Sequence, residues 1–144
     1  MATMDIRPLS DSYAVSPQIA PEDMPAIAEA GYRVVICNRP DGENPPPLAA
    51  ERLRAAAEAA GLTFVENAFN AMTMGPDNVR AQAEAMAAAP GPVLAYCASG
   101  NRSSVVWALA LAGTQPADAL IGAAARHGYQ LEGLRPQLEA AGKG

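Results

Sequence analysis

Short apolar runs alternate along this chain with alanine-rich segments that have the spacing of amphipathic helices. Apolar or alternating runs predict strands at 33–37, 62–66 and 93–96. A Ser-Asp-Ser turn within residues 5–15 predicts a small hairpin at a sheet edge, a position that tolerates Pro8. Helical spacing predicts helices at 21–30, 48–60, 76–89, 103–112, 116–127 and 131–141. This order predicts an α/β fold with a mostly parallel sheet and helices on both faces.

Three loops leave the carboxyl ends of the predicted parallel strands. They span residues 38–47, 67–75 and 97–102. Because ligands of such sheets bind beyond the carboxyl ends of the strands, we expect these loops to share one rim and to hold any functional site.

The third rim loop joins a buried strand to a helix and reads Cys-Ala-Ser-Gly-Asn-Arg. Backbone N–H groups at the start of a helix favour an anion, and the same field favours an ionised thiol. Cys97 is therefore the candidate nucleophile, and the planar guanidinium of Arg102 is the candidate group for binding an oxyanion. The residues expected to line the anion site are Ala98, Ser99, Gly100, Asn101 and Ser103.

Each of these side chains also has a structural interpretation. Cys97 could be a buried core cysteine, because a free thiol behaves as a small apolar group. The hydroxyl of Ser103 or Ser104 could cap the helix, or the Ser103 hydroxyl could tune the basicity of the thiolate. The strand, the turn at Gly100 and the spacing to Arg102 agree with one another, which favours the catalytic interpretation of Cys97.

Composition narrows the class of protein. Residues 1–144 are expected to form a single domain, since half of the residues are hydrophobic (50%) and 17% are charged. A net charge of -5 without a basic run argues against a nucleic-acid partner. No apolar run is long enough to cross a membrane, and the first residues lack the apolar core of a signal peptide, so we expect a cytoplasmic protein. One histidine and two cysteines suggest free thiols and no metal site.

The active-site motif and the segments around it resemble known families. The spacing Cys-x4-Arg resembles the loop of rhodanese-type sulfurtransferases, whereas cysteine-dependent phosphatases carry one more residue between Cys and Arg. Residues 18–23, 31–43 and 91–97 resemble the phosphatase-like domain that occurs alone or joined to metallo-β-lactamase-type persulfide dioxygenases. The resemblance covers roughly residues 4–112. It implies a fold similar to dual-specificity phosphatases, with a loop of rhodanese length.

The resemblance draws attention to the first rim loop, because members of that family carry a similar Arg-Pro-Asp-Gly-Glu stretch there. Arg39 could add a second positive charge at the anion site. Asp41 could be a turn residue or a general acid. Cys37 ends a strand at the same rim, so it could be a resolving thiol or, more simply, part of the core.

Two reactions share a first step, the attack of the Cys97 thiolate on an anion held by the loop. In sulfur transfer, Cys97 takes a sulfane sulfur from a small anionic donor, thiosulfate or glutathione persulfide, and passes it to a thiol acceptor. A persulfide dioxygenase is then a possible partner. In phosphate-ester hydrolysis, Cys97 becomes a phosphocysteine and an acid protonates the leaving group. Neither reaction requires a cofactor.

The second rim loop helps to choose between sulfur transfer and phosphate-ester hydrolysis, because it is where the general acid of a phosphatase would lie. Dual-specificity phosphatases usually present the acid there, but residues 67–75 contain no carboxylate, and Asp77 is more simply a partner of the following helix dipole. Sulfur transfer is therefore the favoured prediction, and phosphatase activity is the alternative. A non-catalytic module that binds an anion or senses redox state through Cys97 is a further alternative.

Overall fold

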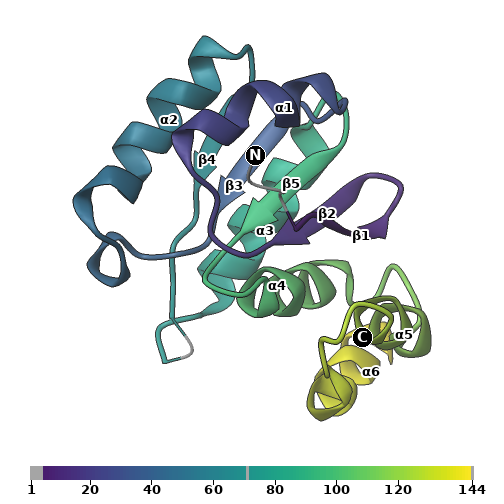
Figure 1. Ribbon diagram of the computed structural model, residues 1–144. Helices are drawn as coiled ribbons and strands as arrows, with labels where there is room; N and C mark the ends of the chain where they lie inside the picture. Colours follow the sequence, from purple (N-terminus) through teal and green to yellow (C-terminus); the bar gives the residue numbers. More distant parts are fainter. Residues whose placement is uncertain (1–4, 71, 144) are drawn as a thin grey trace.

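A five-stranded sheet forms the centre of the protein (Figure 1). The computed structural model describes residues 5–70 and 72–143. The strands lie in the order β1-β2-β5-β3-β4, with β1 and β2 antiparallel and the other neighbouring pairs parallel. Their bounds are β1 Arg7–Ser10, β2 Tyr13–Ser16, β3 Val34–Cys37, β4 Thr63–Glu66 and β5 Val93–Tyr96. The predicted hairpin is thus β1 and β2 at one edge, and β5, which leads to Cys97, is the central strand.

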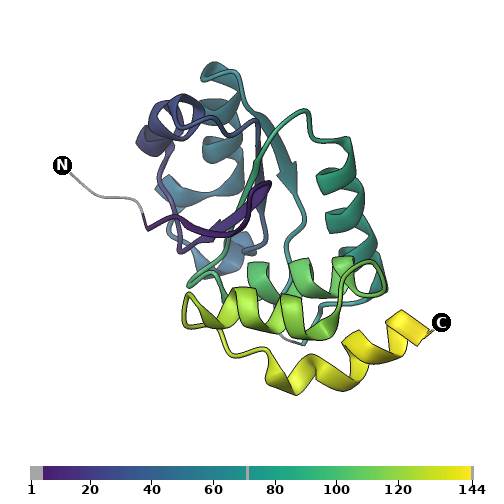
Figure 2. The same cartoon turned by 90° about the vertical axis from the view of Figure 1, so that its right-hand side faces the viewer.

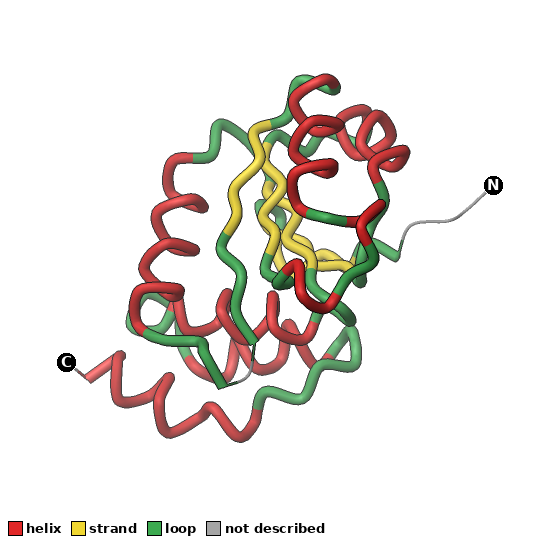
Figure 3. The backbone as a smooth tube through the Cα atoms, turned by 90° about the vertical axis from the view of Figure 1, so that its left-hand side faces the viewer, coloured by secondary structure: helices red, strands yellow, loops and turns green. Residues whose placement is uncertain are grey.

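Helices cover both faces of the sheet, as Figure 3 shows from the side. Helices α1 and α2 pack on one face, and α3 and α4 lie on the other, with α5 and α6 stacked beyond α4 (Figure 2). Their bounds are α1 Met24–Glu29, α2 Ala50–Ala59, α3 Pro76–Ala88, α4 Asn101–Leu111, α5 Ala117–Ala125 and α6 Arg135–Lys143. Among the described residues, no helix has the length and apolar character needed to cross a membrane.

Alternation along the strands divides the core into two clusters. Val35 and Cys37 point into the cluster under α1 and α2, whereas Val34 and Ile36 point into the cluster under the other helices. Trp107 on α4 is buried in this second cluster and stacks on Tyr13, with ring centroids 5.9 Å apart. Because both faces of the sheet are covered, β2, β3 and β5 are buried along their whole length.

The predicted fold class is confirmed, and the differences lie at helix starts. Helix α2 begins at Ala50 rather than at Leu48, because Pro46–Leu48 form a short 3-10 turn and Ala49 after it is extended. Helix α4 begins at Asn101, two residues before the predicted start, because Gly100 adopts a left-handed conformation that turns the chain directly into the helix. A short turn over 132–134 takes the place of the predicted first residues of α6.

Candidate active site

The Cys97 loop begins where β5 ends and closes within three residues. Cys97 is fully buried, and its backbone N–H donates to the carbonyl of Ser16 on β2. Gly100, with φ +94°, reverses the chain so that its own N–H donates to the Cys97 sulfur over 3.0 Å. A residue with a Cβ pays a penalty in this conformation. The sulfur therefore sits inside the turn that starts α4.

Several backbone donors of this turn are free. Within the described part of the chain, the N–H groups of Ala98, Ser99, Arg102 and Ser103 form no hydrogen bond. Asn101 N–H donates to the Ser99 hydroxyl over 3.2 Å. Free N–H groups at a helix start are suited to holding an anion, and here they adjoin a thiol. Of the residues predicted to line the anion site, Gly100 and Asn101 have N–H groups bonded within the loop, so binding of an anion by this loop stays a prediction.

Arg102 is held over the loop by an acidic partner from the first rim loop. Its Nη1 donates to Glu43 Oε2 and to the Phe69 carbonyl, both at 3.0 Å, and its Nη2 donates to Glu43 Oε1 at 2.7 Å. Arg102, and more weakly Arg39, hold the pKa of the Glu43 carboxyl below its usual value. All three predicted rim loops therefore meet at Arg102.

Arg39 and Asp41 have structural partners. Arg39 donates to the Glu43 carboxylate, to the Glu43 carbonyl and to Gln18, so it shares the acid that also binds Arg102. Asp41 Oδ1 accepts the N–H of Ala50 over 2.8 Å, which caps the start of α2. Of the two interpretations of Asp41, this contact supports the turn residue. The predicted second positive charge of Arg39 is partly neutralised by Glu43.

The Ser103 hydroxyl is part of a buried amide network. It donates to Asn38 Oδ1 over 2.8 Å, and Asn38 in turn donates to Gln82 Oε1 and to the Asn67 carbonyl. Gln82 donates to the Tyr13 hydroxyl, which donates back to the Ser103 carbonyl. The network joins the ends of β3 and β4 to α3 and α4. The suggestion that the Ser103 hydroxyl tunes the thiolate has no contact in its favour, and its backbone N–H remains available to an anion.

Ser104 and Cys37 are also engaged elsewhere. The Ser104 hydroxyl donates to the carbonyl of Gly100, the residue before α4, and caps no N–H group. Cys37 donates to the Arg39 carbonyl and packs in the cluster under α1 and α2, where burial raises its pKa. Its neighbours on the sheet are Tyr96 and Glu66, the register partners of Cys37 in β5 and β4. This placement favours the core interpretation of Cys37 over a resolving thiol.

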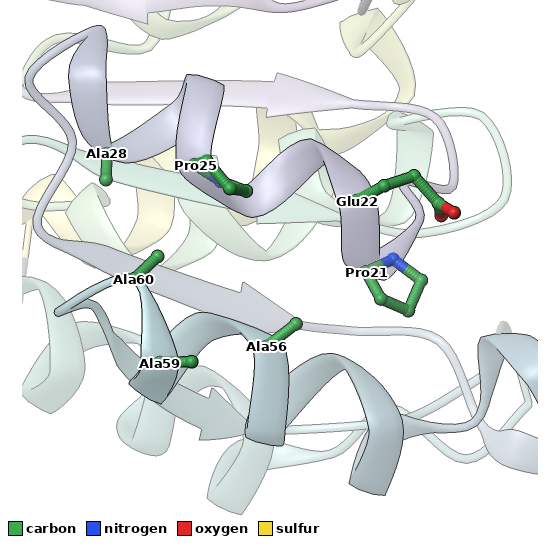
Figure 4. Close-up of a pocket in the computed structure, with 7 residues that line it drawn as sticks. All are labelled: Pro21, Glu22, Pro25, Ala28, Ala56, Ala59 and Ala60. Atoms are coloured by element: carbon green, nitrogen blue, oxygen red, sulfur yellow. The ribbon is translucent and has the colours of Figure 1, made fainter.

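Elsewhere on the surface, a groove runs between α1 and α2 (Figure 4). It is lined by Pro21, Glu22, Pro25, Ala28, Ala56, Ala59 and Ala60. Glu22 is the only one of these side chains with a charge, and neither Cys97 nor Arg102 contributes to the groove. Among the described residues, no group of three His, Cys, Asp or Glu side chains lies close enough to hold a metal ion. The candidate reactive groups, Cys97 and Arg102, therefore lie at the Cys97 loop and not at this groove.

The sequence does not assign the partners that come from distant segments. Glu43 lies in the first rim loop, and an acid that faces an arginine across one rim is the signal that identifies it. Gln82 and Tyr129 carried no such signal, because an isolated glutamine in a helix and a tyrosine after one are ordinary. The bond of Gln82 to Tyr13 depends on the packing of α3, and the bond of Tyr129 to Ser99 in the Cys97 loop depends on the packing of the α5–α6 connection.

Comparison with known proteins identifies the family. Residues 5–114 match the family described as beta-lactamase hydrolase-like protein, phosphatase-like domain. The chain belongs to this family. The resemblance predicted from the sequence motifs over roughly residues 4–112 is thereby confirmed. The comparisons support a phosphatase-like domain and do not support sulfur transfer, so the alternative enzymatic interpretation has the better support.

Individual relatives agree with this assignment. A beta-lactamase hydrolase-like protein of Agrobacterium fabrum is 34% identical over 98 residues, which are 68% of this chain and 22% of that protein. A candidate phosphatase from Neisseria meningitidis, solved by crystallography, is 33% identical with a TM-score of 0.80, covering 94% of this chain and 97% of that one. The chain spans less than a third of the length of the curated relatives it matches.

The fold extends to more distant proteins. The crystal structure of PTPMT1 has a TM-score of 0.72 at 15% identity and covers 96% of this chain and 94% of that one. At this identity the likeness concerns the fold alone. With the Neisseria structure, it confirms the predicted dual-specificity-phosphatase-like fold.

Proposed function

We propose that this phosphatase-like domain hydrolyses phosphate monoesters through a phosphocysteine on Cys97. The observation that carries the proposal is the Cys97 sulfur at the start of α4, with Gly100 N–H bonded to it and free N–H groups around it. Family membership and the solved phosphatase neighbour add support from outside the site.

In the first step, the Cys97 thiolate attacks phosphorus and forms the S–P bond while the P–O bond to the leaving group breaks. The bond electrons go to the leaving oxygen, which takes a proton from solvent. The free N–H groups of the loop and the guanidinium of Arg102 bind the phosphoryl oxygens as they gain charge. In the second step, water attacks phosphorus, the S–P bond breaks, and inorganic phosphate and the thiolate are released.

The carboxylates near the loop restrict the substrates. Glu43 is engaged by Arg102, Asp41 by the start of α2, and Asp77 by Arg80. Without a carboxylic acid held ready at the loop, an alkoxide leaves poorly, whereas a phenolate, whose conjugate acid has a pKa of about 10, leaves more readily. Aryl phosphates are therefore the proposed substrate class.

The test is steady-state hydrolysis of 4-nitrophenyl phosphate, with detection of the trapped intermediate by intact mass. We expect turnover, and an adduct that adds the mass of one phosphoryl group to the protein. The variant Cys97→Ser should lose both, whereas Cys37→Ser should keep both, since Cys37 belongs to the core cluster under α1 and α2. Turnover that survives in Cys97→Ser would overturn the proposal.

Sulfur transfer is the second candidate, favoured by the spacing of four residues between Cys97 and Arg102. A shorter ring of amides suits one sulfur better than a tetrahedral phosphate. The thiolate would attack the sulfane sulfur of thiosulfate, an S–S bond would form, and sulfite would leave with the electron pair of the broken bond and without an acid. An acceptor thiolate would then attack the outer sulfur and release the Cys97 thiolate.

The same samples separate the two candidates. Incubation with thiosulfate or glutathione persulfide should leave the mass unchanged if phosphate hydrolysis is the activity. An adduct with the mass of one sulfur atom, absent in Cys97→Ser, together with no aryl phosphate turnover, would establish sulfur transfer instead. A persulfide dioxygenase would then be the class of enzyme that consumes the persulfide product. If neither adduct forms, the non-catalytic module gains support.

A further inference from the structure

One peptide group of the active-site loop is held from both sides. The group that joins Ser99 to Gly100 presents its N–H to the Cys97 sulfur at 3.0 Å. Its carbonyl oxygen accepts the hydroxyl of Tyr129 at 2.8 Å. Because the C=O and N–H of one trans peptide point in opposite directions, a donor that fixes the oxygen also aims the hydrogen. Tyr129 thus sits opposite the sulfur across a single rigid plane.

Tyr129 is itself fixed in place. It is 5% exposed, and burial raises the pKa of its hydroxyl, which keeps the group protonated as a donor. Arg7 Nη1 donates to the Tyr129 oxygen over 2.9 Å, and the guanidinium carbon lies 5.3 Å from the ring centroid. A hydroxyl that accepts from a cation is a stronger donor, because hydrogen bonds in a chain polarise one another.

A side chain at position 100 would require Tyr129 to move. A Cβ built on Gly100 would lie 2.2 Å from the Tyr129 oxygen, closer than two such atoms approach. The left-handed conformation of Gly100 and the position of the Tyr129 hydroxyl therefore both depend on the absence of a Cβ at residue 100.

We propose that Tyr129 is a positioning residue for Cys97, holding the Ser99–Gly100 peptide so that its N–H faces the sulfur. Tyr129 lies in the connection between α5 and α6, beyond residues 5–114 that match the family. The C-terminal segment thereby contributes to the site. The inference rests on the proposed function only in taking Cys97 as the reacting sulfur.

The other groups that act on the sulfur are distinct from Tyr129. Arg102, paired with Glu43, supplies the nearby positive charge, and the buried Tyr13 hydroxyl is engaged with Gln82 and Ser103. Loss of the Tyr129 hydroxyl leaves these contacts in place. It frees the Ser99 carbonyl to turn, which withdraws the Gly100 N–H that stabilises the ionised form of the sulfur.

The test is a pH titration of the Cys97 thiolate by its ultraviolet absorbance in Tyr129→Phe. Subtracting the spectrum of the same protein with Cys97→Ser removes the signals of Cys37 and of the tyrosines. We expect the midpoint of the titration to rise by about one pH unit, the effect of losing a hydrogen bond to a charged group. The matched control is Tyr32→Phe, a partly buried tyrosine on the α1 side of β3, which should not move the midpoint.

Thermal unfolding shows whether Tyr129→Phe is folded. A folded Tyr129→Phe with an unchanged midpoint would overturn the inference. If that variant does not fold, Arg7→Met provides the test, because it leaves Tyr129 in place but removes its polarising partner. It should raise the midpoint by a smaller amount, and no change would again overturn the inference.

This readout is independent of turnover. A shifted midpoint in a protein without phosphatase activity would leave the inference standing while the proposed function fails. Normal hydrolysis by the wild type, combined with an unchanged midpoint in a folded Tyr129→Phe, would overturn the inference and leave the proposed function standing.

Discussion

Arg102 uses only part of its hydrogen-bonding capacity on partners in the described part of the chain. A guanidinium has five N–H groups in a planar fork. Three hydrogen bonds go to Glu43 and to the Phe69 carbonyl, so the remaining N–H groups are available to an anion beside Cys97. The planar guanidinium can donate to Glu43 and Phe69 on one side and to an anion on the other at the same time, which a lysine ammonium does less well. The pairing with Glu43 therefore orients the positive charge as well as neutralising part of it.

Arg102→Lys is expected to lower kcat/KM for an anionic aryl phosphate by about 10- to 100-fold, since a bidentate charged contact worth ~1.5–3 kcal/mol is lost. Steady-state kinetics measure this. The control is Arg80→Lys, an exposed arginine of α3 that pairs with Asp77, and it should leave kcat/KM unchanged. Unaltered kinetics in Arg102→Lys would contradict the substrate-binding role of Arg102.

Glu43 gives the protein a sensitivity to acid. Arg102 lowers the pKa of the folded Glu43 carboxyl, so this contribution to stability is complete above the unfolded value of about 4.3 and is lost as pH falls through the folded value. Because the Glu43 side chain is 34% exposed, solvent screens the pair and the contribution is at most about 1 kcal/mol. In Glu43→Gln, the part of the acid-induced loss of stability that comes from this pair should be absent.

Urea unfolding at neutral pH and below pH 4 measures the difference. Glu84→Gln is the control, because Glu84 is exposed on α3 and forms no ion pair within the described part of the chain. The two variants should differ in how much stability they lose between the two pH values. Equal losses in Glu43→Gln, Glu84→Gln and wild type would show that the pair contributes nothing measurable.

Among the secondary-structure elements, α3 supports the site without reaching the sulfur. Gln82, fully buried near its centre, accepts from Asn38 and Asn67 and donates to Tyr13. Asn38 and Asn67 come directly after β3 and β4, so one helix side chain ties together the starts of two rim loops. Ser103 joins the same network from α4. A polar network of this kind stabilises only while its members are satisfied.

Gln82→Met preserves the size of the side chain but removes its four hydrogen bonds with Asn38, Asn67 and Tyr13. We expect a loss of ~1–3 kcal/mol in the free energy of unfolding, because buried polar partners lose contacts. Denaturant unfolding measures it. Glu84→Met, an exposed position of the same helix, should change stability by less than about 0.5 kcal/mol. Similar effects of the two substitutions would mean that the network adds little to stability.

For the whole molecule, the question is whether the C-terminal helices unfold with the sheet. Trp107, the single tryptophan, is buried in a cluster that contains Val15 and Ile36 from the sheet, Leu120 from α5 and Leu138 from α6. Shared burial of this kind couples the segments into one cooperative unit. The family match ends at residue 114, before α5 begins.

Tryptophan fluorescence and far-ultraviolet circular dichroism should therefore report one coincident thermal transition. In Leu120→Ala both curves should move together to lower temperature, with a loss of ~2–5 kcal/mol, because Leu120 is fully buried. The exposed change Glu51→Ala on α2 should move neither by much. Two separated transitions in wild type would show that residues after 114 form an independent unit.

The structure confirms most of what the pattern of residues predicts. Strands 33–37, 62–66 and 93–96 agree with β3, β4 and β5 to within one residue, and the three rim loops do meet. The preference for sulfur transfer came from one spacing and one missing carboxylate, and the comparisons favour the phosphatase interpretation instead.

The sequence by itself determined the elements and the position of the Cys97 loop, because hydrophobic period, glycine and the Cys-x4-Arg spacing act between near neighbours in the chain. The tertiary structure alone decided what surrounds that loop. Glu43 meets Arg102 from 59 residues away, and Tyr129 meets Ser99 from 30 residues away. Such contacts depend on how the helices pack against the sheet, and no local pattern specifies them. The Cys97 loop is therefore specified by a short motif, whereas the side chains that contact it come from distant segments.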